Sequence, residues 1–451
     1  MTKSDVDSTT ADFAGQLLRP GDQSYEQVRR IHNGHIDKRP RLIALCADTS
    51  EVVSALELAE RSGLEVSVRG GGHSIAGRSV VDDGLMIDLS PMKRIVIDSE
   101  TRLAQIGGGA TWGEVNEATS AHGLGTTGGI ISTTGVGGLT LGGGMGWLMA
   151  TRGLSIDNLL SVEIVLADGQ VLPADENTNP DLFWAIRGGG GNFGIVTSFE
   201  FRLHPVTEIR GGLVAHPFDA ARDFLRFLAD YSAAGTDELS VMPLLVHAPD
   251  GSGLKLAATA VAHFGTAAQA EAELRPLLEF GSPVLSDVGP ISYPALNSML
   301  DGGFPAGASY YWKSNFMSSI TEEAVDIMID RFLQCPSTMS GIALEHLHGA
   351  MTRVPVRATA FPHRQPGYNV LIAGVWADPS ANAQNIAWTR ATYEALQPLL
   401  GSGRYVNYLS EDDRAAVPDA YGPNLARLTE IKRRYDPSNR FHLNHNIEPA
   451  D

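Results

Sequence analysis

The chain has 451 residues, of which 43% are hydrophobic and 19% charged, enough for two globular domains with proper cores. Its formal net charge of −18 argues against a nucleic-acid-binding surface, and the polar N-terminus and absence of any long apolar run argue against a signal peptide or membrane span, so a cytoplasmic enzyme is expected. The two cysteines, Cys46 and Cys335, lie far apart and form no CxxC, which indicates neither a disulfide framework nor a zinc-thiolate site.

The first 205 residues predict short strands and helices joined by glycine-rich loops. Residues 1–36 are polar and mixed, which indicates a partly ordered lead-in. A helix is expected to begin at Asp48, with acidic residues in its first turn, and to end at Gly63. Further elements complete an α+β unit: strands at 66–68, 85–89, 94–97 and 195–203, a helix at 112–122, and a hairpin turn at Asp168–Gly169.

After about residue 205 the composition changes, because the glycine runs stop and longer helices alternate with strands. Amphipathic helices are expected at 219–234 and 321–333, and strands at 310–313, 343–348 and 368–376. This pattern favours an antiparallel sheet with helices on one face.

The most informative residue is His73, which follows the strand at 66–68 and the glycines 70–72 directly. Glycines let a backbone turn sharply and bring its N–H groups against a bound group. A nucleophilic ring nitrogen next to such a turn suggests that the bound group is also bonded covalently to the protein. A GxGxxG match at Gly189–Gly194 does not favour a dinucleotide fold, since a helix precedes it and a strand follows it, the reverse of the fingerprint's order.

The run Arg69-Gly-Gly-Gly-His73-Ser-Ile-Ala-Gly77 resembles the flavin-attachment loop of the berberine-bridge-enzyme-like oxidases, a group of the vanillyl-alcohol-oxidase type. The resemblance extends from about residue 39 to 449. It rests also on the glycine loop at 135–146, the segment 184–197, and the C-terminal motifs at 405–408, 435–437 and 444–447.

The resemblance implies a domain order, which we expect as follows. A lead-in at 1–36 precedes a PCMH-type FAD-binding domain at 37–205. A substrate-binding domain at 206–400 is inserted, and a C-terminal segment at 401–451 returns to the FAD-binding domain.

By the resemblance, a His73 ring nitrogen is bonded to the 8α-methyl group of FAD. Arg69 either fixes the loop or faces the polar side of the cofactor. The residues expected around the cofactor are His73, Arg69, Gly70, Gly71, Gly72, Ser74, Gly77, Thr133, Thr134, Gly137, Gly138, Gly144, Gly146, Val196, Asn407 and Asn444.

Three departures from the family pattern matter. Ile131 stands where many members carry a second, cysteinyl link, which predicts attachment through His73 alone. Thr134 stands where a valine or leucine opens or blocks the path of oxygen, which leaves the choice between oxidase and dehydrogenase open. Leu371 stands where several members place the glutamate or glutamine that accepts a proton, so the catalytic base is not carried over.

Candidates for proton transfer are Tyr405 and Tyr408, with Lys313 as a cation that could stabilise a phenolate, and His346, which titrates near neutrality unaided. Strand alternation places His346 and His348 on one face and Glu345 on the other.

The leading hypothesis is an FAD-dependent oxidase that takes a hydride from a C–H next to oxygen or nitrogen of a small molecule and reduces O2 to H2O2. The alternatives are a dehydrogenase with another acceptor, a metal enzyme built on His346 and His348, and a flavoprotein that only binds a ligand. The sequence does not identify the substrate or the oligomeric state.

Overall fold

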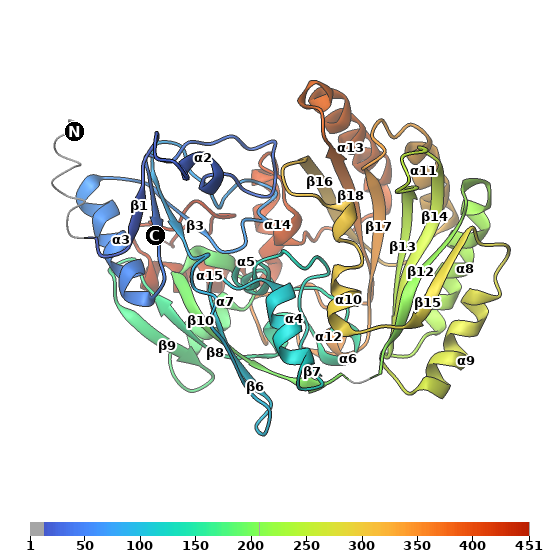
Figure 1. Ribbon diagram of the computed structural model, residues 1–451, viewed down its shortest axis with the longest axis horizontal. Helices are drawn as coiled ribbons and strands as arrows, with labels where there is room; N and C mark the ends of the chain where they lie inside the picture. The colour runs from blue at the N-terminus through green and yellow to red at the C-terminus, as the bar shows by residue number, and fades with distance from the viewer. Residues whose placement is uncertain (1–12, 207, 451) are drawn as a thin grey trace.

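The computed structural model describes residues 13–206 and 208–450 and contains three main sheets (Figure 1). The first has the order β1-β2-β4-β3, with strands Gln16–Leu18, Leu42–Leu45, Leu85–Asp88 and Val66–Arg69. Strands β2, β4 and β3 are parallel, and β1 pairs with β2 antiparallel. Helix α3 (Thr49–Ser62) packs its apolar residues against this sheet; Asp48 caps its start and Gly63, at a φ of 60°, ends it as predicted.

The second sheet is antiparallel, with the order β5-β6-β10-β8-β9. Its strands are Ile95–Asp98, Leu103–Gly107, Ile195–Arg202, Leu159–Val165 and Val171–Asp175. Helices α4 (Trp112–Ser120), α5 (Val136–Leu141), α7 (Pro180–Ile186) and α15 (Leu425–Tyr435) contribute to the core on this sheet. A short pair, β7 (Leu124–Gly125) with β11 (His204–Pro205), leads to the rest of the chain.

The third sheet has seven antiparallel strands in the order β15-β12-β14-β13-β17-β18-β16. Their bounds are Leu285–Pro290, Arg210–Pro217, Lys255–His263, Leu239–His247, Gly341–Leu347, Gly367–Trp376 and Ser309–Met317. Helices α8 (Ala221–Ala234), α9 (Ala267–Leu278), α11 (Glu322–Leu333) and α13 (Asn382–Leu396) cover one face, at the right of Figure 1. The predicted fold class, a PCMH-type α+β unit with a helix-covered antiparallel sheet, is confirmed.

The other face of the seven-stranded sheet is turned toward the first two sheets (Figure 1). Short helices α6 (Met149–Arg152), α10 (Tyr293–Ser298) and α12 (Ala350–Arg353) lie between them. The chain after residue 400, with α14 (Val417–Tyr421) and α15, returns to the first two sheets at the left of Figure 1. The expected domain order and its boundaries stay a prediction.

The segment expected to form the lead-in packs against the protein where it is described. Residues 16–18 add a strand to the first sheet, and α2 (Tyr25–Val28) is anchored by the fully buried Tyr25, whose hydroxyl donates to the Pro40 carbonyl at 2.7 Å. The expected lead-in includes residues 1–12, which lie outside the described residues. From residue 13 on, burial of these side chains holds the segment against the protein.

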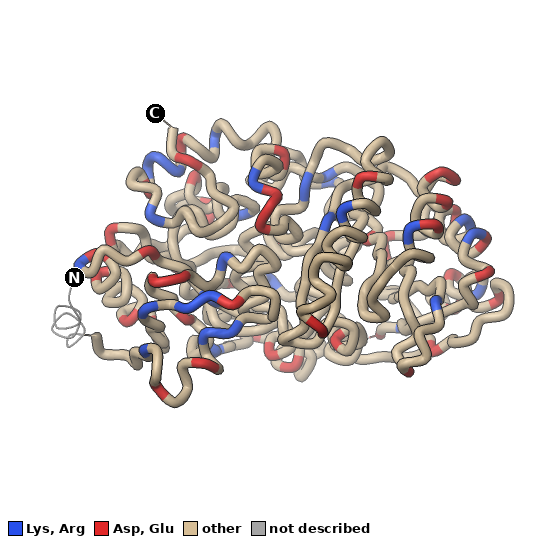
Figure 2. The backbone as a smooth tube through the Cα atoms, turned by 90° about the horizontal axis from the view of Figure 1, so that it is seen from above, with Lys and Arg blue, Asp and Glu red and all other residues tan. Residues whose placement is uncertain are grey.

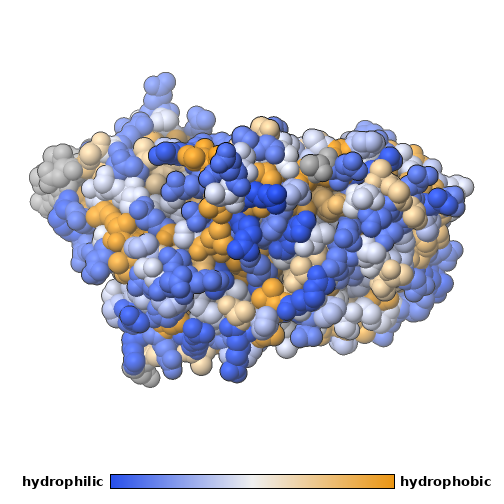
Figure 3. All heavy atoms as spheres, turned by 90° about the horizontal axis from the view of Figure 1, so that it is seen from below, coloured by the Kyte–Doolittle hydropathy of each residue, from blue (hydrophilic) through white to orange (hydrophobic). Residues whose placement is uncertain are grey.

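Charged residues of both signs are interspersed along both halves of the molecule (Figure 2). The face in Figure 3 is mainly polar, with apolar side chains in smaller groups. Among the described residues, no helix has both the length and the apolar character needed to cross a bilayer.

Candidate active site

A cavity lies where the glycine loops, the C-terminal segment and the inner face of the seven-stranded sheet meet. Most of its glycines come from three loops that are far apart in the sequence, 70–72, 135–138 and 190–194, and Gly108 and Gly129 add to the wall. Close packing requires glycine at the crossing of two of these loops, because a Cβ atom on Gly71 would lie 2.3 Å from the Gly135 nitrogen. The predicted residues on its wall are His73, Gly70, Gly71, Gly72, Ser74, Thr134, Gly137, Gly138, Val196, Tyr405, Asn407, Tyr408 and Asn444.

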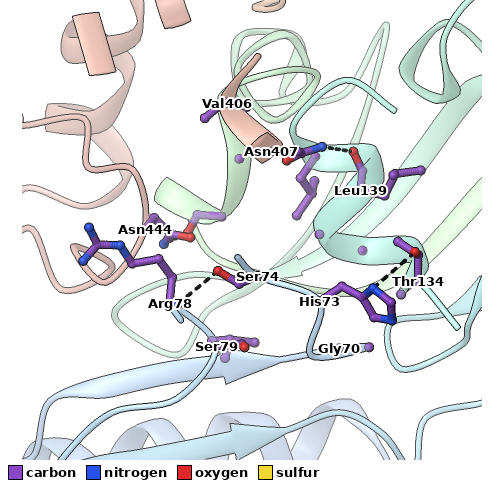
Figure 4. A pocket seen from close by; sticks show the side chains of 18 of the residues that line it. Gly70, His73, Ser74, Arg78, Ser79, Thr134, Leu139, Val406, Asn407 and Asn444 are labelled. Atoms are coloured by element: carbon purple, nitrogen blue, oxygen red, sulfur yellow. Dashed lines mark hydrogen bonds between the residues drawn. The ribbon is translucent and has the colours of Figure 1, made fainter. Parts of the chain in front are cut away.

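His73 stands at the wall of this cavity, near Thr134 (Figure 4). Its Nε2 lies 2.9 Å from the Thr133 hydroxyl, and its Nδ1 lies 3.5 Å from the Thr134 hydroxyl. Burial, with a smaller contribution from His32, lowers the pKa of His73 to about 3. The imidazole is therefore neutral at physiological pH and keeps a nitrogen lone pair.

Several predicted residues support the cavity without lining it. Arg69 pairs with the Asp88 carboxylate and donates to backbone carbonyls of Val28 and Arg30, so it fixes the loop to the preceding segment. Gly77, at a φ of 67°, packs on Ile36. Thr133, Gly144 and Gly146 also stand behind the wall: Thr133 bonds to His73, the Gly144 N–H donates to Tyr405, and Gly146 packs against the Gly128 carbonyl.

Polar side chains brace the loops. Asn407 donates to the Leu139 carbonyl at 3.0 Å (Figure 4). It also donates to the Tyr405 hydroxyl at 2.9 Å. Asn444 donates to the Gly191 carbonyl at 3.0 Å. These bonds tie the C-terminal segment to two of the glycine loops.

Lys313 and His346 lie elsewhere, which corrects their expected place in the site. Lys313 is on β16, and its Nζ binds Asp412 at 3.0 Å and Asp413 at 2.5 Å. Its neighbour Trp312, on the opposite face of the strand, contacts the Tyr408 ring at a centroid distance of 5.2 Å. The Lys313 ammonium is therefore occupied by two carboxylates and does not face the cavity.

His346 is on β17 and stacks on His348 at 4.0 Å and on Tyr368 at 5.0 Å, among side chains that face the helices. Burial lowers the pKa of His346 to about 3. Among the described residues, no group of three or more His, Cys, Asp or Glu side chains is placed to hold a metal ion, so nothing there completes a site with His346 and His348.

Glu345 was missed as a site residue. Its carboxylate accepts a hydrogen bond from the Tyr408 hydroxyl at 2.8 Å and one from the Asn369 amide at 2.6 Å. The alternation along the predicted strand already placed Glu345 on the face opposite His346. The sequence did not show which face meets the cavity, since both faces of β17 are packed.

The N-terminal segment and the first loop also contribute residues that were missed. The His32 ring stacks on His73 with a centroid distance of 3.9 Å, and burial lowers the pKa of His32 to about 4. Arg78 lines the cavity, and its buried Nε has no hydrogen-bond partner in the described chain. The guanidinium of Arg78 takes part in no ion pair among the described residues.

Comparisons with known proteins agree with this architecture. Residues 40–175 match the family described as "FAD binding domain", and residues 404–448 match that described as "Berberine and berberine like". An FAD-linked oxidoreductase of Dictyostelium discoideum is 30% identical over 439 residues, covering 96% of this chain and 95% of the relative. The (R)-6-hydroxynicotine oxidase of Paenarthrobacter nicotinovorans is 30% identical over 469 residues, covering 98% of each chain.

Among solved structures, 6-hydroxy-D-nicotine oxidase from Arthrobacter nicotinovorans superposes with a TM-score of 0.90 at 28% identity, covering 97% of this chain and 98% of that one. The similarity thus spans both the glycine-loop half and the seven-stranded sheet. The chain belongs to the berberine-bridge-enzyme-like family of FAD-linked oxidoreductases.

Proposed function

We propose that this protein is an FAD-dependent oxidase whose flavin is attached through His73 alone. It removes a hydride from a C–H next to oxygen or nitrogen of a small organic molecule, and O2 is the final electron acceptor. The observation that carries this proposal is the neutral imidazole of His73 at the wall of a cavity built from three glycine loops.

The cavity fits FAD in two respects. On Gly138, a Cβ atom would meet nothing within 4 Å, so this loop leaves open space beside the cavity, as close approach of a cofactor to the backbone requires. Arg78, whose Nε has no hydrogen-bond partner among the described residues, supplies a positive charge at the wall, which suits the pyrophosphate anion.

Single attachment follows from the chemistry of the wall. His73 offers a nitrogen lone pair, whereas Ile131, which also lines the cavity, offers no nucleophile. Attachment would replace one 8α-methyl hydrogen by a ring nitrogen of His73, and the imidazole would lose its own N–H proton. The two protons and two electrons released in this way would be taken up by O2 as H2O2.

In turnover, the bound flavin would accept the hydride and pass two electrons to O2. The chain's own residues shape the reaction space: Ile75, Leu139, Met145, Phe304 and Trp312 make much of the wall near Tyr405 and Tyr408 apolar. An apolar wall excludes water and favours a ring-bearing alcohol or amine over a saccharide. The name of the hydroxynicotine oxidase relative points to a cyclic amine of this kind.

The test has two parts. Acid-precipitated wild-type protein should retain its yellow colour, and a peptide containing position 73 should carry the mass of FAD. The variant His73→Ala should release its flavin on precipitation, and covalent flavin retained in that variant would contradict the attachment site.

The second part mixes the purified protein anaerobically with (R)-6-hydroxynicotine, 4-methoxybenzyl alcohol or xylobiose. Bleaching by one of the first two, followed by O2 consumption and equimolar H2O2, is expected. Bleaching without reoxidation by O2, but with reoxidation by a dye, would instead identify a dehydrogenase, the outcome that Thr134 leaves open.

A further inference from the structure

A second cavity lies on the outer side of the loop that carries His73. It has a volume of about 960 Å³, within the size range of small-molecule sites. Its lining comes mainly from the N-terminal segment at 30–37, the glycine loop at 69–73, the segment at 301–309 and Asn382 of α13. We call it the outer cavity, and the cavity of the candidate active site the inner cavity.

The two cavities share part of their wall. The residues that border both are His32, Gly70, Gly71, Gly72, His73 and Phe304. The glycines contribute only backbone there, and the two histidine rings are held by their mutual stacking and by the bond between His73 and Thr133. Phe304 is the remaining shared side chain, and its surroundings are different.

Weak contacts hold the Phe304 ring. The ring is half-buried, meets the Trp312 ring edge to face at a centroid distance of 6.0 Å, and stacks on the Tyr310 ring at 6.5 Å. Both distances lie in the upper part of the range for aromatic pairs, which is about 4.5–7 Å. Trp312 lines the inner cavity but not the outer one, so a flat ring that enters from the outer cavity can take over the contact with Trp312.

The backbone is anchored on both sides of Phe304. On one side, the Asp301 carboxylate accepts hydrogen bonds from the Ser132 N–H, at 2.9 Å, and from the Ser132 hydroxyl. On the other side, the Pro305 carbonyl accepts a hydrogen bond from the Tyr310 hydroxyl at 2.7 Å. The ends of this short segment are therefore fixed to the rest of the protein.

Two glycines lie between these anchors. Gly302 and Gly303 are exposed, and a Cβ atom on either would meet nothing within 4 Å. The Phe304 N–H makes a turn bond to the Asp301 carbonyl at 3.0 Å. Because glycine changes its backbone conformation at little cost, Phe304 can turn away from Trp312 while both anchors stay in place.

We propose that the donor substrate enters the inner cavity through the outer cavity, and that Phe304 is the gate that selects flat, ring-bearing donors by size. The inference rests on the proposed function, which puts the flavin at the His73 wall. Bound FAD would obstruct entry past Arg78, because the proposed function assigns that part of the wall to the pyrophosphate.

The charges of the outer cavity favour a donor without a large net charge. Side chains of both signs line it: Arg30, Arg69, Lys93, Asp37 and Asp301. Lys93 is paired with Glu114, and Asp37 is paired with Arg29. A cavity lined by both signs does not concentrate ligands of one charge, so selection falls to the size and shape of the donor.

The first experiment enlarges the gate with Phe304→Ala. Anaerobic flavin reduction is followed by stopped-flow absorbance with 4-methoxybenzyl alcohol and with the longer 4-benzyloxybenzyl alcohol. One methylene in an apolar site is worth about 10- to 200-fold in discrimination, so the second-order rate constant for the longer donor should rise at least about 10-fold relative to that for the shorter one. An unchanged ratio of the two constants overturns the inference.

The matched control is Phe227→Ala. Phe227 is a half-buried phenylalanine of α8 that lines neither cavity. This variant should keep the wild-type ratio of the two second-order rate constants.

A second experiment separates the entry route from the inner wall. Ala306 is exposed and lines only the outer cavity, so Ala306→Cys can be labelled there with pyrenyl maleimide. The label should lower the second-order rate constant for 4-methoxybenzyl alcohol at least about 10-fold, while the limiting rate at saturating donor stays the same, as expected when access and not chemistry is obstructed. An unchanged second-order rate constant contradicts the proposed route.

Three controls accompany the label. Ala306→Cys carrying only a methylthio group should react like the wild type. Ser252→Cys, on an exposed turn that lines neither cavity, should be insensitive to pyrenyl maleimide. Wild-type protein treated with the same reagent accounts for any reaction at Cys46 or Cys335.

A third measurement does not need a substrate. Hydrogen exchange of the holoenzyme, read by mass spectrometry, should label the amides of residues 302–304 at the shortest times while those of β16 stay protected, because opening of the gate breaks only a turn bond. Equal protection of the two segments would contradict a moving gate.

The two levels fail differently. If no donor bleaches the wild-type flavin while residues 302–304 exchange as expected, the proposed function is at fault. If donors bleach the wild type and neither Phe304→Ala nor the label on Ala306→Cys alters the second-order rate constants, only the entry route is at fault.

Discussion

The imidazole rings of His32 and His73 stack with their centroids 3.9 Å apart and an angle of 21° between their planes. The stack joins the N-terminal segment to the glycine loop, and a backbone bond from His32 N–H to the Gly72 carbonyl, at 3.0 Å, reinforces it. Two imidazoles so close cannot both be charged cheaply, and burial lowers the pKa of each. The molecule therefore keeps His73, the proposed attachment residue, neutral by packing it against a second neutral ring.

Buried neutral histidines predict that folding stability falls with acidification. The folded pKa is about 4 for His32 and about 3 for His346, below the usual value near 6.5, because of burial. Between the lowered pKa of the folded state and the usual value near 6.5, the unfolded chain binds more protons than the folded one. The stability is thus fully present above about pH 6.5 and declines as the pH falls toward 4.

The measurement is denaturant unfolding of the holoprotein at pH 7, 6 and 5. In His346→Gln the unfolding free energy should depend less steeply on pH, because the unfolded chain would bind up to one proton fewer relative to the folded state. A slope equal to that of the wild type would show that His346 is protonated alike in both states.

Arg78 should contribute to FAD affinity through its charge. The covalent bond would mask affinity, so the comparison is made in the His73→Ala background. A charge-assisted hydrogen bond is worth about 1.5–3 kcal/mol, so Arg78→Ala should weaken FAD binding about 10- to 100-fold. Fluorescence titration with FAD and with riboflavin, which has no phosphate, provides the check.

Riboflavin affinity should hardly change, and Arg78→Lys should recover part of the FAD affinity. Equal losses for FAD and riboflavin would mean that Arg78 shapes the loop rather than holding an anion.

Much of this organisation could be predicted from the sequence, because local rules govern it. Asp48 and Gly63 bound a helix by capping, and the glycines before His73 are required by close backbone contacts. What escaped prediction is set by tertiary contacts. Alternation separated Glu345 from His346, yet which face meets the cavity depends on where β18 and the C-terminal segment pack.

The sequence did not identify Arg78 as a site residue for a similar reason. The loop pattern contains it, but only folding shows that its Nε finds no partner in the described chain and that it borders the same cavity as Asn444 (Figure 4). A charged residue in a sequence is usually solvated. Its isolation becomes informative only once burial is known.

Gly138 gives a prediction with opposite signs for folding and for binding. It lies inside α5, where alanine is favoured over glycine by about 1 kcal/mol, and a Cβ there meets no protein atom within 4 Å. In the His73→Ala background freed of flavin, Gly138→Ala should therefore unfold at the same or a higher denaturant concentration. FAD binding should nevertheless weaken, since the methyl group enters the space beside the cavity.

The control for this substitution is Gly302→Ala, which is also free of contacts but does not line the cavity. It should leave FAD affinity unchanged. Unaltered FAD affinity in Gly138→Ala would place the cofactor away from α5.

Removal of the hydroxyl group should have different effects on stability and on flavin reduction at Tyr405 and at Tyr408. In Tyr405→Phe, the Gly144 and Met145 N–H groups and the Asn407 amide lose their common acceptor. An unsatisfied buried polar group costs about 1–3 kcal/mol, so unfolding should require markedly less denaturant. Because the Tyr405 hydroxyl braces the loop and burial raises its pKa to about 12, flavin reduction should slow only modestly.

In Tyr408→Phe the balance is reversed. Only the bond to Glu345 is lost, so the loss of stability should be smaller than in Tyr405→Phe, where three N–H donors lose their acceptor, while a candidate proton acceptor at the cavity wall is removed. Flavin reduction by 4-methoxybenzyl alcohol should slow by at least about 100-fold, the range for loss of acid–base catalysis. Stopped-flow rates and unfolding midpoints measured on both variants decide the assignment, and a larger rate loss in Tyr405→Phe at unchanged stability would give the proton-transfer role to Tyr405 instead.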